Sequence, residues 1–74
     1  MNCTIMMRWD DEARVWIATS KNVPGLVLED STFEALVEEV KLAVPTLLRL
    51  NGIACTDAEL DFVCRRQERL AMVG

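Results

Sequence analysis

The sequence predicts an α+β domain with the order β-β-β-α-β: a three-stranded antiparallel meander, one long helix and a C-terminal strand. Three observations predict it. Two runs of bulky apolar residues flank a polar break, a Pro-Gly pair precedes a third apolar run, and apolar residues then recur at helical spacing. The 74 residues leave room for one domain, spanning 1–74.

The first two strands are expected at residues 3–9 and 14–19, joined as a hairpin. The break between them, Asp10-Asp11-Glu12-Ala13, has no Asn-Gly or Asp-Gly, so we expect a four-residue loop rather than a two-residue turn. This loop length opposes Trp9 to Arg14, Met7 to Trp16 and Ile5 to Ala18.

These pairings decide which side chains share a face of the sheet, because side chains alternate along a strand. Trp16 and Ala18 then lie with Ile5, Met7 and Trp9. A three-residue bulged loop would invert the second strand, so that alternative stays open. The opposite face is expected to carry Met6, Arg8, Val15 and Ile17.

A turn and a third strand are expected next. Asn22-Val23-Pro24-Gly25 predicts the turn because proline presets φ and glycine tolerates positive φ. Leu26-Val27-Leu28 follows as a short strand antiparallel to the second.

A long helix is expected from Thr32 to Leu50. Ser31-Thr32-Phe33-Glu34 matches a capping box with the Ser31 hydroxyl as the cap, and Asn51-Gly52 is typical of a helix C-terminus. We expect the apolar stripe of this helix to cover the sheet face that carries Trp16. The stripe consists of Phe33, Leu36, Val37, Val40, Val44, Leu47 and Leu48.

The C-terminal part allows two interpretations. Thr56-Asp57-Ala58-Glu59 is a second capping-box match and favours a short helix. Leu60, Phe62 and Cys64 alternate with polar neighbours, which favours a strand. The basic run 65–69 has no apolar face that decides between them.

Charge disfavours nucleic-acid binding. Twelve Asp and Glu oppose eight Lys and Arg, for a net charge of −4, whereas domains that bind phosphate backbones are usually basic. The one basic cluster, Arg65, Arg66 and Arg69, is better explained as a charged edge strand or a solvated helix face. An acidic surface suits a basic protein partner.

No pattern indicates catalysis, a cofactor or a metal site. The chain has no histidine and its cysteines form no CxxC pair, which disfavours zinc. The carboxylates of Asp10, Asp11 and Glu12 lack the further ligands of a calcium loop. The three glycines form no phosphate loop. We therefore expect no enzyme activity.

The expected location is a reducing cytoplasm. The N-terminus lacks the apolar core of a signal peptide, and no run reaches the length of a membrane span. Cys3, Cys55 and Cys64 are expected as small core residues rather than disulfide partners.

Three landmarks stand in order along the chain: Trp9–Ala18, Asn22–Leu26 and Asp30–Leu36. This arrangement resembles the HicB-like antitoxin family, and especially its short single-domain relatives of unassigned function. The resemblance covers Met6 to Gly52 well and the tail more loosely. Similar features follow in Pro45, Leu50-Asn51-Gly52 and the final stretch Phe62–Arg66.

The resemblance implies a fold sometimes called a partial ribonuclease H fold, with the tail as a strand. Members of the family bind and neutralise a small basic RNA-cleaving toxin, and many form dimers or tetramers. Longer members add a DNA-binding domain, for which 74 residues leave no room. The chain also lacks the inward carboxylate set of a true ribonuclease H, so the fold name implies no chemistry.

The sequence therefore predicts a non-catalytic protein-interaction module that neutralises such a toxin. The alternatives are a small nucleic-acid-binding protein using the C-terminal arginines, or an orphan self-associating domain. We expect a homo-oligomer, because one helix covers one face of the sheet and leaves an apolar patch on the other. A tail folded back over that patch would instead give a monomer. The expected oligomer or partner interface consists of Met6, Arg8, Val15, Ile17, Arg65 and Arg66.

Overall fold

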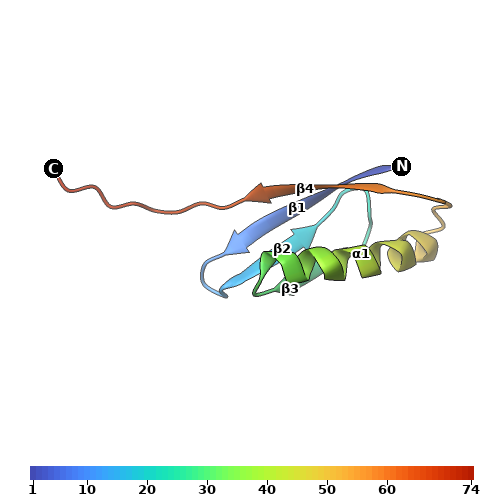
Figure 1. The fold of residues 1–74 in the computed structure, drawn as a ribbon, viewed down its shortest axis with the longest axis horizontal. Coiled ribbons are helices and arrows are strands. Elements are labelled where there is room, and N and C mark those ends of the chain that lie inside the picture. Colours follow the sequence, from blue (N-terminus) through green and yellow to red (C-terminus); the bar gives the residue numbers. More distant parts are fainter.

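In the computed structural model, which describes residues 1–74, a four-stranded sheet carries one helix on one of its faces (Figure 1). The strands lie in the order β3-β2-β1-β4; β1–β2 and β2–β3 are antiparallel, and β4 runs parallel to β1. The predicted fold class and element order are confirmed. The elements are β1 (Asn2–Asp10), β2 (Val15–Thr19), β3 (Val27–Asp30), α1 (Phe33–Leu50) and β4 (Glu59–Arg65).

The register of the first hairpin differs from the prediction. Trp9 lies opposite Trp16 rather than Arg14. The predicted pairs Trp9–Arg14, Met7–Trp16 and Ile5–Ala18 are therefore wrong. The loop has four residues as expected, but it spans 11–14 and begins one residue later.

Two local features close the loop at this position. The Asp10 carboxylate accepts hydrogen bonds from the backbone N–H groups of Glu12 and Ala13, at 3.1 and 3.2 Å. Arg14 takes a positive φ of 58°, which turns the chain back into β2. The partner of Trp9 moves by an even number of residues, from 14 to 16, so the faces are unchanged. Trp16 shares the face of Met7, as predicted.

A turn with Pro24 and Gly25 at its centre precedes β3, as expected, but it spans residues 23–26 rather than 22–25. The N–H of Leu26 donates to the carbonyl oxygen of Val23 at 3.2 Å, and Gly25 has a φ of +87°. Proline followed by a positive-φ glycine is the arrangement of a type II turn. The Val23 side chain is fully buried beneath it. The strand itself begins at Val27, one residue later than predicted.

The N-terminus of α1 is capped by Thr32, so the prediction of Ser31 as the cap is wrong. The Thr32 hydroxyl oxygen accepts a hydrogen bond from the N–H of Ala35 at 3.3 Å. The Asp30 carboxylate accepts one from the N–H of Thr32 at 3.0 Å. This bond holds Thr32 in an extended conformation, from which its hydroxyl reaches the free N–H groups of the first turn.

The C-terminus of α1 ends as predicted at Asn51-Gly52. The N–H of Ile53 donates to the carbonyl of Leu48 at 2.9 Å, and that of Gly52 to Arg49 at 3.0 Å. With Gly52 at a φ of +70°, these bonds form a Schellman motif. The Asn51 side-chain amide also donates to the carbonyl of Pro24, which ties the helix end to the β2–β3 turn.

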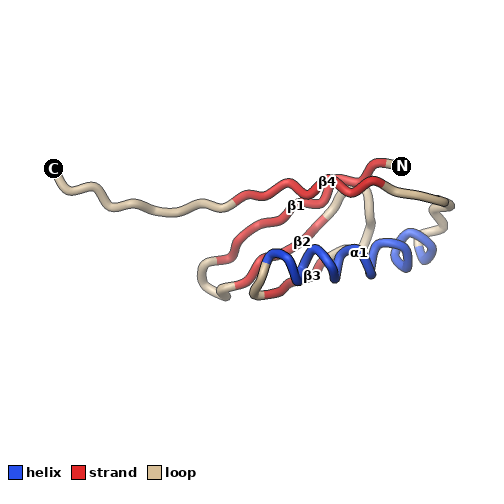
Figure 2. The backbone as a smooth tube through the Cα atoms, in the orientation of Figure 1, coloured by secondary structure: helices blue, strands red, loops and turns tan.

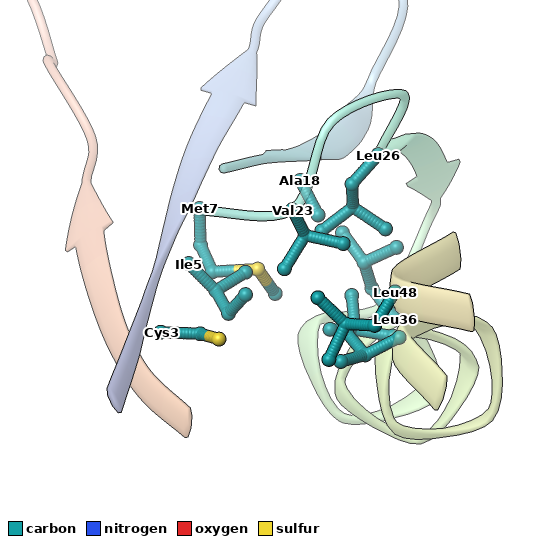
Figure 3. Packing of buried hydrophobic residues seen from close by; sticks show 10 residues of the cluster. Cys3, Ile5, Met7, Ala18, Val23, Leu26, Leu36 and Leu48 are labelled. Atoms are coloured by element: carbon teal, nitrogen blue, oxygen red, sulfur yellow. The ribbon is translucent and has the colours of Figure 1, made fainter. Parts of the chain in front are cut away.

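The core lies between the sheet and the helix, where side chains of β1 and the β2–β3 turn meet one side of α1 (Figure 3). Cys3 belongs to it, but Cys55 and Cys64 are exposed, so the prediction of three core cysteines is wrong. Cys55 lies in the loop after α1, and Cys64 lies near the end of an edge strand. The buried residues are Cys3, Ile5, Met7, Ala18, Val23, Leu26, Leu36, Val40, Val44 and Leu48.

The tail forms a strand as far as Arg65. The strand predicted from the alternation of Leu60, Phe62 and Cys64 is therefore confirmed, and the helix predicted from the capping box at Thr56 is wrong. Leu60 and Phe62 pack against the core, and β1 supplies a free edge on which β4 pairs. Residues 66–74 then extend away from the sheet as an irregular segment (Figure 2), and the molecule measures 57 × 19 × 18 Å. The tail therefore does not cover the sheet.

Candidate functional site

The sheet face opposite α1 is uncovered, and we name it the open face. Across the sheet, Met6 lies between Thr19 of β2 and Val63 of β4. Met6 and Val63 expose 39% and 44% of their surface, so the centre of the open face is apolar and accessible. Val15 and Ile17 extend the patch along β2, where both are partly buried.

Five of the six predicted interface residues lie together on the open face. Arg8 stands beside Ile17 on one side and Arg65 on the other. Val63 was not predicted, because its face depends on the pairing of β4 with β1. Local alternation does not reveal that pairing. The five residues are Met6, Arg8, Val15, Ile17 and Arg65.

Arg8 and Arg65, which are opposite each other on neighbouring strands, form no ion pair. The ion pairs of the chain join Arg14 to Asp11, Lys41 to Glu38 and Arg66 to Glu68, and none includes Arg8 or Arg65. A hollow of about 270 Å³ lies beside them, lined also by Trp9, Asp11 and Gln67. Two like charges without a counter-ion can accept a carboxylate of a partner in bidentate geometry.

Arg66, the sixth predicted residue, lies on the opposite face of the sheet. Its guanidinium stacks over Trp9 at 4.6 Å from the ring centroid and lies 5.8 Å from that of Trp16. Arg14 approaches the Trp9 ring at 5.1 Å. The predicted basic cluster is therefore divided between two faces and forms no continuous basic surface.

A groove opens where α1 ends and β4 begins, and we name it the helix-end groove. Its volume is about 960 Å³, and its apolar wall includes Val44, Pro45, Leu48, Ile53 and Leu60. The groove was not predicted from the sequence, because it arises from the way the loop at 52–58 passes the helix end. No local pattern encodes that path.

Two further observations concern the titratable side chains. No three His, Cys, Asp or Glu side chains lie close enough together to hold a metal ion. The pKa of Glu39 is raised above its ordinary value of 4.5. The larger cause is loss of hydration, and the smaller is repulsion from the Asp30 carboxylate. This pair lies at the side of α1, away from the open face. The single helix does not combine the length and the apolar character that a membrane span requires.

Comparison with known proteins identifies the family. The family described as "Domain of unknown function (DUF1902)" matches residues 2–73. This chain belongs to the DUF1902 family. No curated protein matches it.

The DUF1902 chain is also similar to a solved structure, that of the hypothetical protein TTHA1013 from the extremely thermophilic bacterium Thermus thermophilus. The two share 33% sequence identity, and the match covers 97% of this chain and 100% of the other, with a TM-score of 0.74. The open face and the helix-end groove of the DUF1902 chain both lie within the residues that the family matches.

Proposed function

We propose that this DUF1902 domain is a non-catalytic protein-interaction module whose open face binds a small basic protein, as a HicB-like antitoxin binds its RNA-cleaving toxin. One observation carries the proposal. The exposed apolar residues Met6 and Val63 are followed on the same face by Arg8 and Arg65, which form no ion pair.

This combination suits a protein surface better than a small ligand. An accessible apolar centre releases water when a partner covers it, and arginine is enriched among residues that dominate binding energy. The carboxylates of Glu29 and Asp61 lie on the same face at its two sides. They complement a basic partner, and the net charge of −4 favours its approach.

The nucleic-acid alternative is the weaker one. Arg65 points to the open face, whereas Arg66 is stacked on Trp9 and paired with Glu68 at 2.8 Å. A strand of nucleic acid would have to displace these contacts on a chain of net negative charge.

The experiment uses the purified product of any neighbouring reading frame that encodes a small, basic, histidine-bearing protein. Binding is measured by calorimetry, and neutralisation by RNA integrity in the presence of both proteins. We expect the parent to bind and to protect RNA, and Ile17→Asp to lose both, because a buried carboxylate in an apolar contact is costly.

Leu42→Asp is the matched control. Leu42 is 79% exposed on α1, on the other side of the molecule, and its variant should bind like the parent. Equal loss in both variants, or no binding by the parent, contradicts the proposal.

The Ile17→Asp variant also tests self-association through the open face. That self-association stays a prediction. If light scattering shows that Ile17→Asp converts an oligomer to a monomer, a second copy and not a basic partner occupies this face.

A further inference from the structure

We propose that β4 of one copy pairs antiparallel with β4 of a second copy about a twofold axis at Val63. In this dimer, residues 66–74 of each copy, which we name the arm, lie against the helix-end groove of the other. The proposal uses the edge of the sheet and not the open face. It goes beyond the function proposed above, although Val63 and Arg65 belong to both surfaces.

The outer edge of β4 has unpaired backbone groups. The N–H of Glu59 donates to the carbonyl of Met1 at 2.9 Å, so the backbone of Glu59 points toward β1. Because backbone direction alternates along a strand, Leu60, Phe62 and Cys64 direct their N–H and C=O groups away from the sheet. No other strand covers this edge, which leaves a template for pairing with another chain.

The charges along β4 are self-complementary. On the side of the open face, carboxylates precede Val63 and guanidinium groups follow it. An antiparallel pair centred on Val63 opposes Asp61 to Arg65 of the second copy. Continued outward, it opposes Asp57 to Arg69. Opposite charges directly across an antiparallel pair are stabilising.

Neighbouring registers match fewer opposite charges than this one. Opposed residues must share a face, so the axis moves in whole residues. Centred on Phe62, the pair opposes Glu59 to Arg65 but leaves Asp61 opposite Val63. Centred on Cys64, it opposes Asp61 to Gln67 and Arg65 to Val63. Only the axis at Val63 opposes both Asp61 and Asp57 to arginines, and Arg65 has no ion pair within its own chain.

The same register brings the arm to the groove. In an antiparallel pair, the C-terminal end of one β4 lies beside the N-terminal end of the other, where the helix-end groove opens. Leu70 then lies opposite Thr56 of the second copy, and Met72 opposite Ala54. Leu70 and Met72 are 79% and 83% exposed in the single chain, and the groove has the apolar wall to cover them.

The resulting dimer has one continuous eight-strand sheet, since each copy contributes the strand order β3-β2-β1-β4. A twofold axis perpendicular to the sheet places both helices on one side. The two open faces then adjoin on the other side, where Met6 and Ile17 stay accessible.

Charge-reversal variants test the register of the strand pair. Their dimer affinity is measured by sedimentation equilibrium. Each altered contact occurs twice per dimer, so Asp61→Arg or Arg65→Asp alone should weaken dimerisation by about tenfold or more. The double variant restores the opposite charges and should recover the affinity of the parent. Glu29→Arg, on the far edge strand of the same face, is the control and should leave dimerisation unchanged.

A crosslink tests the axis directly. In the Cys55→Ser/Cys64→Ser background, Val63→Cys brings two thiols together across a non-hydrogen-bonded pair, with Cα atoms about 4.5 Å apart. A mild oxidant that accepts the two electrons and two thiol protons should give a covalent dimer. Val27→Cys, on the other edge of the sheet, should stay monomeric under the same conditions.

Removal of residues 67–74 tests the arm. The truncated protein should dimerise more weakly, and Leu70→Asp should reproduce that effect in the full chain. A monomeric parent at micromolar concentration, a dimer that single charge reversals leave intact, or equal crosslinking at positions 27 and 63 overturns the strand pairing. A truncated protein that dimerises like the parent overturns the placement of the arm.

Discussion

Trp16 meets Phe33 edge to face, with ring centroids 5.1 Å apart and ring planes at 84°. Trp16 lies on β2, an inner strand, at the end of the sheet next to the first hairpin loop, and Phe33 is the first residue of α1. This contact therefore fixes the N-terminal end of the helix on the sheet, and edge-to-face geometry is favourable for aromatic pairs. Trp9 extends the cluster, with its ring centroid 5.3 Å from that of Trp16.

Trp16→Ala should destabilise the domain by about 3 kcal/mol, the low end for a large aromatic because Trp16 is partly exposed. For a domain of this size, such a loss is a large part of the total stability. Denaturant unfolding followed by circular dichroism measures it. A midpoint close to that of the parent would show that the contact with Phe33 does not hold the helix.

Thr32→Ala should cost about 1 kcal/mol, because it leaves the N–H of Ala35 without its acceptor. Ser31→Ala is the matched control, since the Ser31 hydroxyl caps nothing in the structure, and it should change stability little. Equal losses in the two variants would restore Ser31 as the helix cap.

Gly25→Ala should destabilise the domain by about 1–2 kcal/mol, because an L side chain is strained at a φ of +87°. The added methyl group would lie 3.5 Å from a methyl carbon of Leu47, which is an ordinary contact, so the cost is one of backbone conformation. Gly25→Asn should cost less, because asparagine tolerates positive φ better. Thermal melts of both variants measure the order, and a reversed order would point to a steric cause.

Glu39→Gln should stabilise the domain at neutral pH. Loss of hydration and the Asp30 carboxylate raise the pKa of Glu39 in the folded state above 4.5. The protonated form therefore favours folding. Its contribution is fully present below pH 4.5 and is lost as the pH rises through the raised pKa.

The measurement is the free energy of unfolding against pH for the parent and for Glu39→Gln. The variant should exceed the parent at pH 7, and the two curves should converge below pH 4.5. Glu38→Gln, which removes an exposed ion pair with Lys41, should show no gain at neutral pH. A constant difference at every pH would exclude repulsion from Asp30 as the cause.

Local patterns predicted the elements of this fold well, because each element has a strong signal of its own. The apolar stripe around Leu36 and Val40 predicted the helix and the face it covers. The errors at Ser31 and in the Trp9 pairing are shifts that depend on single side chains. The Asp30 and Asp10 carboxylates select one of two neighbouring arrangements by hydrogen bonds that composition and periodicity do not reveal.

The candidate site was predicted in part for a related reason. Met6, Arg8, Val15 and Ile17 belong to one hairpin, and alternation alone places them together. Val63 joins them only because β4 adds to β1 in parallel, and the helix-end groove exists only because the loop at 52–58 closes over the end of α1. Both depend on contacts between distant parts of the chain.

The parallel pairing of β1 with β4 also sets the order in which the molecule can assemble. Asn2 pairs with Glu59, so β1 gains its second neighbouring strand only after the chain between these two residues has brought its ends together. The hairpin of β1 and β2 forms early by comparison, since its two strands are joined by a short loop. Until β4 arrives, β1 presents one unsatisfied edge, with Cys3, Ile5 and Met7 on one of its faces. A folding chain of this kind is most prone to aggregation through β1 during that interval.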